Sequence, residues 1–259
     1  MGWAEQILWW GNVSLILALG IKLAVAGLHR TYRWFFAFLT FQVVQSAVML
    51  PLDPARDEYA WAYLLTQPVL WVLYILVVLE VYSLALRNHP GIASLSRWVL
   101  LGGLIISISV SALTLSADLS NPTGRFPVLV YVGVIERGLT FSLVVFLLLI
   151  SGFLLWTPIR LPRNVALHAC VYSLYFFSTA SGLLIRNVLG YQLVGGVSVA
   201  ILSSYDLCLL LWILFLNRKG EETPVVIRRL WRQSDEDQIT RQLDAINAFL
   251  LRSAGKQDR

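Results

Sequence analysis

Apolar residues fall into seven long runs separated by short polar stretches. Each run is long enough to cross the hydrocarbon of a bilayer, which takes roughly 20 helical residues with a range of about 17 to 25. The pattern therefore predicts an all-α fold, a bundle of seven transmembrane helices whose short connections make consecutive helices antiparallel neighbours. The predicted helices are residues 7–28, 34–50, 60–86, 98–115, 127–156, 165–189 and 197–216.

Arginines in the connections predict the orientation of this bundle. The connections after the first, third and fifth runs carry arginine and no acidic residue. Cytoplasmic loops of membrane proteins are enriched in lysine and arginine, so these connections are predicted to be cytoplasmic, with the amino terminus outside and the carboxyl terminus inside. The arginines concerned are Arg30, Arg33, Arg87, Arg97, Arg160 and Arg163.

The composition agrees with a membrane protein. The chain is 58% hydrophobic and only 14% charged, and its mean hydropathy of +0.70 excludes a soluble globular domain. A net charge of +5 does not indicate a nucleic-acid partner, because the basic residues lie beside apolar runs rather than on one soluble face; the predicted partner is the lipid bilayer. Cys170 and Cys208 lie inside apolar runs without CxxC spacing, so no disulfide, metal site or cofactor is predicted.

The sixth run carries a polar stripe. Its members recur in steps of four and three residues, which keeps them on one face of a single helix. Polar groups that face hydrocarbon find no partners, so this face is predicted to look into the bundle interior or into a watery cavity. The stripe consists of His168, Tyr172, Tyr175, Thr179, Gly182 and Arg186.

Polar residues of other runs complete a candidate ligand cavity in the outer and central part of the bundle. The full set is Gln42, Gln45, Glu136, Arg137, Tyr175, Thr179, Arg186 and Asp206. Two interpretations are open for Gln42, Gln45, Tyr175, Thr179 and Asp206, which either line a cavity or form interhelical hydrogen bonds without a ligand. Glu136 and Arg186 are predicted to touch near the outer interface, either as a structural ion pair or as part of a binding site.

Three further polar residues are placed toward the inner face, namely Lys22, Glu80 and His168. Lys22 is expected to snorkel to the headgroups, and Glu80 to contact Arg87 or Lys22. The three histidines of the chain lie on or near the inner side, but they lack HxxxH or HExxH spacing. No catalytic residue and no metal ligand is therefore assigned.

After the membrane domain, residues 1–217, the charged segment 218–259 is predicted to be a cytoplasmic tail. Thr223 and Pro224 are typical of a helix start, here of a helix in the headgroup layer. A second amphipathic helix is predicted over 234–254. It either packs on the inner loops, on the membrane or on its own copy in a homodimer, or binds a cytoplasmic protein.

Four segments resemble a family of seven-pass bacterial membrane proteins with no assigned activity. They are LHRTYRWFFAFLTF (28–41), LEVYSLALRNHPGIASLSRW (79–98), ERGLTF (136–141) and RNVALH (163–168). The resemblance covers most of the membrane part but not the tail. It implies a bacterial inner-membrane location, and it transfers no catalytic residues.

These observations favour a non-enzymatic function. The 234–254 helix favours a sensor, signalling or adaptor protein, because such a protein needs a tail that reaches a partner. The stripe from His168 to Arg186 spans the whole sixth helix and favours the alternative, a small-molecule or ion transporter with a polar path. An intramembrane or lipid-modifying enzyme is the third hypothesis.

Overall fold

The computed structural model describes residues 3–53, 56–87, 127–156, 161–189 and 194–225, together with the isolated positions 102, 105, 241, 245 and 248. The described chain is helical, as predicted, with one short two-stranded ribbon in addition. Its elements are α1 (Trp3–Val25), η1 (Leu28–Arg30), α2 (Arg33–Met49), α3 (Asp57–Ala85), α5 (Pro127–Trp156), β1 (Leu161–Pro162), α6 (Arg163–Leu189), α7 (Val194–Phe215), α8 (Lys219–Glu222) and β2 (Pro224–Val225). Apart from the isolated positions, the predicted helices 98–115 and 234–254 lie outside the described residues.

Local sequence explains how these helices begin and end. Asp57 and Glu58 occupy the first turn of α3, where negative charge interacts favourably with the helix dipole. After α1, Gly27 adopts a left-handed conformation with φ of 71°, which glycine tolerates at little steric cost. The chain reverses there through the single turn of η1 and enters α2.

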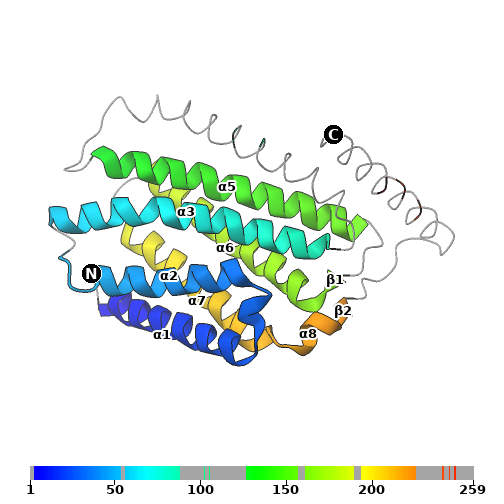
Figure 1. The fold of residues 1–259 in the computed structure, drawn as a ribbon. Coiled ribbons are helices and arrows are strands. Elements are labelled where there is room, and N and C mark those ends of the chain that lie inside the picture. The colour runs from blue at the N-terminus through cyan, green and yellow to red at the C-terminus, as the bar shows by residue number, and fades with distance from the viewer. Residues whose placement is uncertain are drawn as a thin grey trace, which may run out of the picture.

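The long helices form a closed ring in the described part of the chain (Figure 1). Contacts run from α1 to α2, α3, α5, α6 and α7 in turn, and α7 returns to α1. Helices joined by short described connections are therefore neighbours, as expected from the sequence. A further contact joins α3 to α6, and α8, β1 and β2 lie together at one end of the bundle (Figure 1).

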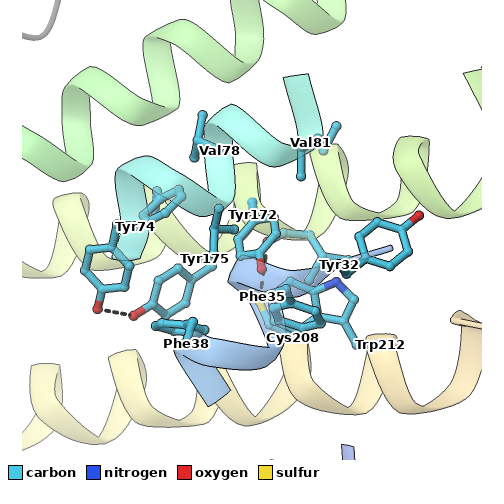
Figure 2. Packing of buried hydrophobic residues seen from close by; sticks show 14 of the residues in the cluster. Tyr32, Phe35, Phe38, Tyr74, Val78, Val81, Tyr172, Tyr175, Cys208 and Trp212 are labelled. Carbon is cyan, nitrogen blue, oxygen red and sulfur yellow. Dashed lines mark hydrogen bonds between the residues drawn. The ribbon is translucent and has the colours of Figure 1, made fainter. Parts of the chain in front are cut away.

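Aromatic side chains fill the middle of this ring (Figure 2). The rings of Phe35 and Phe38, both on α2, pack inward against rings of α3, α6 and α7. The centroid of Phe35 lies 4.8 Å from that of Trp212, and the centroid of Phe38 lies 5.5 Å from that of Tyr74. Tilted and edge-on ring pairs add to the stability gained from burial of apolar area, so α2 is held to three other helices through these two positions.

Three described helices are long and apolar enough to cross a membrane, namely Ile7–Val25 within α1, Asp57–Ala85 and Gly195–Phe215 within α7. These helices also expose large apolar side chains, for example Leu65 at 72% and Leu214 at 69%. Such side chains are unfavourable over a large water-exposed surface and are matched by lipid. Length and surface together indicate a helical membrane protein.

The described residues after α7, up to Val225, pack on the bundle. Strands β1 and β2 pair antiparallel, with Leu161 opposite Val225, and the Arg163 amide donates a 3.0 Å hydrogen bond to the Thr223 carbonyl. The predicted helix start at Thr223 and Pro224 is therefore wrong. Thr223 is the C-cap of α8 and Pro224 lies in β2, because pairing with the chain before α6 replaces helical hydrogen bonds.

Candidate functional site

The polar stripe of the sixth run lies on the inner face of α6. His168, Tyr172, Tyr175 and Thr179 are all buried, whereas Phe177 on another face of the same helix is 60% exposed. The expectation that this face is turned away from lipid agrees with these burials. The side chain of Arg186 is outside the described part of the structure, so the outer end of the stripe stays a prediction.

Gly182 explains why the stripe contains a residue without a side chain. A Cβ added at this position would collide with the side chain of Ile201 on α7. Small residues let the backbones of two membrane helices approach closely. Gly182 therefore serves packing between α6 and α7 rather than a ligand.

His168, near the start of α6, lies among aromatic side chains. Its ring centroid lies 4.4 Å from Tyr32, 4.9 Å from Phe35, 5.7 Å from Tyr172 and 5.9 Å from Trp212. His168 is 0% exposed. Within the part of the chain that the structure describes, neither imidazole nitrogen has a hydrogen-bond partner, and the Tyr172 hydroxyl and the Trp212 indole N–H likewise have none.

Hydrogen bonds between helices account for several of the predicted cavity residues. The hydroxyls of Tyr175 on α6 and Tyr74 on α3 lie 2.8 Å apart (Figure 2). The Tyr205 hydroxyl, on α7, donates to the side-chain oxygen of Gln42 on α2. The rings of Tyr175 and Tyr205 are 5.0 Å apart, so these contacts connect α2, α7, α6 and α3 across the ring.

The remaining polar candidates of this set also have protein partners. Asp206 on α7 accepts a 2.7 Å hydrogen bond from the Asn12 amide on α1. Gln45 on α2 donates at 2.9 Å to Thr66 on α3, and Thr179 donates at 2.9 Å to the Tyr175 carbonyl of its own helix. For Gln42, Gln45, Tyr175 and Asp206, these contacts support interhelical hydrogen bonding, the second of the two interpretations left open by the sequence, whereas Thr179 bonds within its own helix.

Glu136 and Arg137 lie on α5, and the structure brings Glu136 close enough to interact electrostatically with Tyr74 and Tyr175. Helices α5 and α6 are neighbours, as the proposed pair of Glu136 with Arg186 requires. The pair itself stays a prediction because the Arg186 side chain is not among those described. Glu136 thus adjoins the tyrosine contacts of the bundle centre.

Glu80 and Lys22 have partners that differ from those expected. The Glu80 carboxylate accepts hydrogen bonds from the Trp34 and Phe35 amides, at 3.0 and 3.1 Å. It thereby caps the first turn of α2, where backbone N–H groups have no partner within the helix. The expected contacts of Glu80 with Arg87 or Lys22 are not formed among the described residues.

Lys22 is expected to snorkel toward headgroups, but the structure turns its ammonium group toward a neighbouring helix. The group donates to the Ile213 carbonyl in the last turn of α7, where carbonyl oxygens carry partial negative charge and lack helical partners. Lys22 and Glu80 therefore share one role, since each satisfies the backbone at the end of an adjacent helix.

A compact polar junction connects the tail to the bundle. The Glu221 carboxylate of α8 accepts a 2.5 Å hydrogen bond from the Tyr32 hydroxyl before α2 and a 2.6 Å bond from the Asn164 amide on α6. The same amide donates at 2.8 Å to the Asn217 carbonyl after α7. We call Tyr32, Asn164, Asn217 and Glu221 the tail junction. The Asn164 amide, in the first turn of α6, thus binds the tail through two acceptors.

Burial keeps the Tyr32 hydroxyl of the tail junction protonated. Tyr32 and Asn164 are each 0% exposed. Burial raises the pKa of Tyr32, and the hydrogen bond to Glu221 raises this pKa further, so the hydroxyl stays protonated and donates to the carboxylate. Gly220 packs directly on the Asn164 side chain, where a Cβ would collide with the amide, and this contact fixes α8 against α6.

Sequence reasoning misses the partners that make these contacts, namely Asn12, Tyr32, Thr66, Tyr74 and Glu221. Asn12 is a lone amide in an apolar run, and such a residue indicates an interhelical hydrogen bond. Tyr32 and Tyr74 give no such indication, because tyrosine is also common at membrane interfaces. Glu221 belongs to a charged segment in which no feature distinguishes it from Glu222. Comparisons with protein-family models, curated proteins and solved structures found no match.

Proposed function

We propose that this chain is a seven-pass protein of a bacterial inner membrane that senses a small ligand or a state of the bilayer and relays it through its tail. In this proposal the amino terminus is outside and the carboxyl terminus is in the cytoplasm. The tail helix 234–254 binds a cytoplasmic protein or a second copy of the chain. The observation that supports the relay most strongly is the tail junction.

The tail junction joins three separate parts of the bundle through the Glu221 carboxylate and the Asn164 amide. Tyr32 precedes α2, Asn164 lies at the start of α6, and Asn217 follows α7. A displacement of the start of α2 or of α6 changes the hydrogen-bond partners of Glu221, which is the third residue of α8. A displacement of the end of α7 acts through the Asn217 carbonyl, which binds the same Asn164 amide. A tail attached in this way responds to the arrangement of the bundle, whereas a tail on a flexible linker does not.

A transporter is the second candidate, and one observation favours it. The stripe of α6 contains buried polar atoms without partners in the described chain, at His168 and Tyr172. Unsatisfied buried polar groups are costly, and a solute or water that passes along α6 satisfies them transiently. One observation argues against a transporter. Gln42, Tyr175 and Asp206 form hydrogen bonds with other side chains and so are not free to bind a solute.

An experiment that separates the two functions uses a fluorophore on the tail. Ala248 is exposed and helical, so it is a suitable position for a label. The fluorophore is attached to Ala248→Cys in a chain in which Cys170 and Cys208 are replaced. The labelled protein is then reconstituted in short-chain and in long-chain phosphatidylcholine. The relay predicts emission that changes with bilayer thickness and a response that Glu221→Gln abolishes. Glu222→Gln is the matched control, because Glu222 is the exposed neighbour.

Equal responses in the two glutamine variants would exclude a relay through the tail junction. The transporter hypothesis is tested in the same vesicles. It predicts uptake of a solute by a chain that ends after Val225, because transport does not need the rest of the tail.

A further inference from the structure

A groove between α2 and α3 lies beside the tail junction but is not part of it. It has a volume of about 680 Å³. Of the residues singled out in the sequence, Arg33 and Glu80 line it. We propose that this groove binds one anionic phospholipid, with the phosphate at Arg33 and an acyl chain between α2 and α3. The site stands whether or not the tail relays a signal.

The order of side chains along the groove matches the order of groups in a phospholipid. Thr31, Arg33 and Ser83 line the end near the start of α2 and the end of α3. Ala37 and Leu76 line the deeper part, about 6 Å from Arg33 and about 10 Å from Ser83 along their helices at 1.5 Å per residue. The Ser83 hydroxyl donates to the Glu80 carbonyl, so Thr31 and Arg33 are the donors for a headgroup, and the apolar floor suits its acyl chain.

Charge favours an anionic headgroup. Arg33 is exposed and interacts electrostatically with Glu80, but among the residues that the structure describes no acidic side chain lies within salt-bridge distance of it. Its guanidinium therefore remains available for the bidentate hydrogen bonds that phosphate accepts. The predicted orientation places Arg33 on the cytoplasmic side, where an excess of arginine is usual.

The carboxylate on the groove wall does not oppose this assignment. Both oxygens of Glu80 accept hydrogen bonds from the first turn of α2, from Trp34 and Phe35, and the positive end of the helix dipole offsets the charge. The Trp34 side chain also lines the groove and is 45% exposed. Tryptophan at this level is typical of the region where headgroups meet acyl chains.

Occupancy of the groove also bears on the tail. Tyr32, whose hydroxyl binds Glu221, stands in sequence between the two proposed headgroup residues Thr31 and Arg33. A lipid phosphate there contacts the residues on both sides of the Tyr32 backbone. The proposed anionic lipid would therefore bind next to the tail junction, where a protein that senses its membrane needs an effector site.

The test measures lipid binding directly on the full chain. Purified protein is titrated with phosphatidylglycerol and with phosphatidylcholine of the same acyl chains, and bound lipid is counted by native mass spectrometry. We expect tighter binding of phosphatidylglycerol, and a loss of about fivefold in that preference in Arg33→Gln, as for one basic group near an anionic headgroup. Arg30→Gln is the matched control, because Arg30 is exposed at the same end but does not line the groove.

A second measurement identifies the occupant. A photoreactive amino acid replaces Leu76 in the groove floor, and the protein is illuminated in phosphatidylglycerol vesicles. A cross-link to lipid is the expected result, whereas a cross-link to peptide 234–254 or to a second copy of the chain would overturn the proposal. Equal lipid preference in the Arg33→Gln and Arg30→Gln proteins would overturn it as well.

Discussion

Individual charged residues in this bundle stabilise the ends of neighbouring helices. Glu80 of α3 accepts the Trp34 and Phe35 amides at the start of α2, and Lys22 of α1 donates to the Ile213 carbonyl at the end of α7. Removal of such a partner leaves backbone groups unsatisfied in a poorly hydrated place. The ionisable residues of the apolar runs thus have a structural reason to be present even before a ligand is considered.

The first prediction concerns Glu80. Glu80→Gln should lower the free energy of unfolding by about 1–3 kcal/mol, because the neutral amide offers one acceptor in place of two charged oxygens. Glu222→Gln, the same change at an exposed position, should be neutral within about 0.5 kcal/mol. Denaturant unfolding in detergent measures both variants. Equal stability of the two proteins would show that the cap at α2 contributes nothing.

Whole helices are positioned by two kinds of contact, close approach at a small residue and packing of buried aromatic rings. Gly182 lets α6 approach Ile201 of α7, and the aromatic residues Phe35 and Phe38 fix α2 inside the ring. The same helices carry the tyrosine contacts, so their spacing decides whether Tyr205 reaches Gln42 and Tyr175 reaches Tyr74.

The second prediction tests the contact between α6 and α7. Gly182→Ala places a methyl group against Ile201 and should cost about 1–3 kcal/mol, as overpacking does. Ile201→Ala in the same chain should recover part of that loss. Gly152→Ala on α5 meets no atom within 4 Å and should not destabilise. Thermal unfolding compares the variants, and a loss that Ile201→Ala leaves unchanged would argue against this contact.

The sequence predicts the helices well because a span leaves a long periodic signal. The ranges 34–50 and 127–156 are matched by α2 and α5 almost to the residue. The partners of polar residues are harder to predict, since Asn12 meets Asp206 only after α1 and α7 close the ring. The ribbon of β1 and β2 is not predicted from the sequence for another reason. Its strands have two residues each, which is too short for a recognisable alternation of apolar and polar positions.

At the scale of the whole molecule, we expect the ends of α1, α3 and α7 and the starts of α2 and α6 to lie on one side of the membrane. The third prediction is that reporter fusions after Arg33, Arg97, Arg163 and Arg259 are cytoplasmic, whereas fusions after Arg56, Arg125 and Gly195 are external. The reason is the excess of arginine in alternate connections. One cytoplasmic connection that reads as external would contradict the seven-pass topology.

The fourth prediction defines where the membrane domain ends. A chain that stops after Val225 keeps α8, the ribbon and Glu221, and it should unfold at the same denaturant concentration as the full chain. A chain that stops after Asn217 leaves Tyr32 and Asn164 buried without their carboxylate partner and should be less stable by about 2–4 kcal/mol. Equal stability of both truncated proteins would place the domain boundary before α8.

The coupling between the bundle and the tail is the central claim of this account, and hydrogen exchange at the tail junction measures it most directly. Tyr32→Phe removes one hydroxyl before α2 and leaves α8 and β2 chemically unchanged. The amides of Gly220, Glu221 and Thr223, which are hydrogen-bonded in the described structure, should then exchange about tenfold faster or more, because a hydrogen bond to a charged group stabilises by roughly 1.5–3 kcal/mol.

Tyr59→Phe is the control for this measurement. It makes the same chemical change in the first turns of α3, far from the tail in sequence, and it should leave exchange in the peptide 218–225 as it is in the parent chain. Faster exchange in Tyr32→Phe alone is the result that the relay predicts. Equal exchange in the parent, Tyr32→Phe and Tyr59→Phe proteins would contradict it, since the tail would then not respond to the bundle through Glu221.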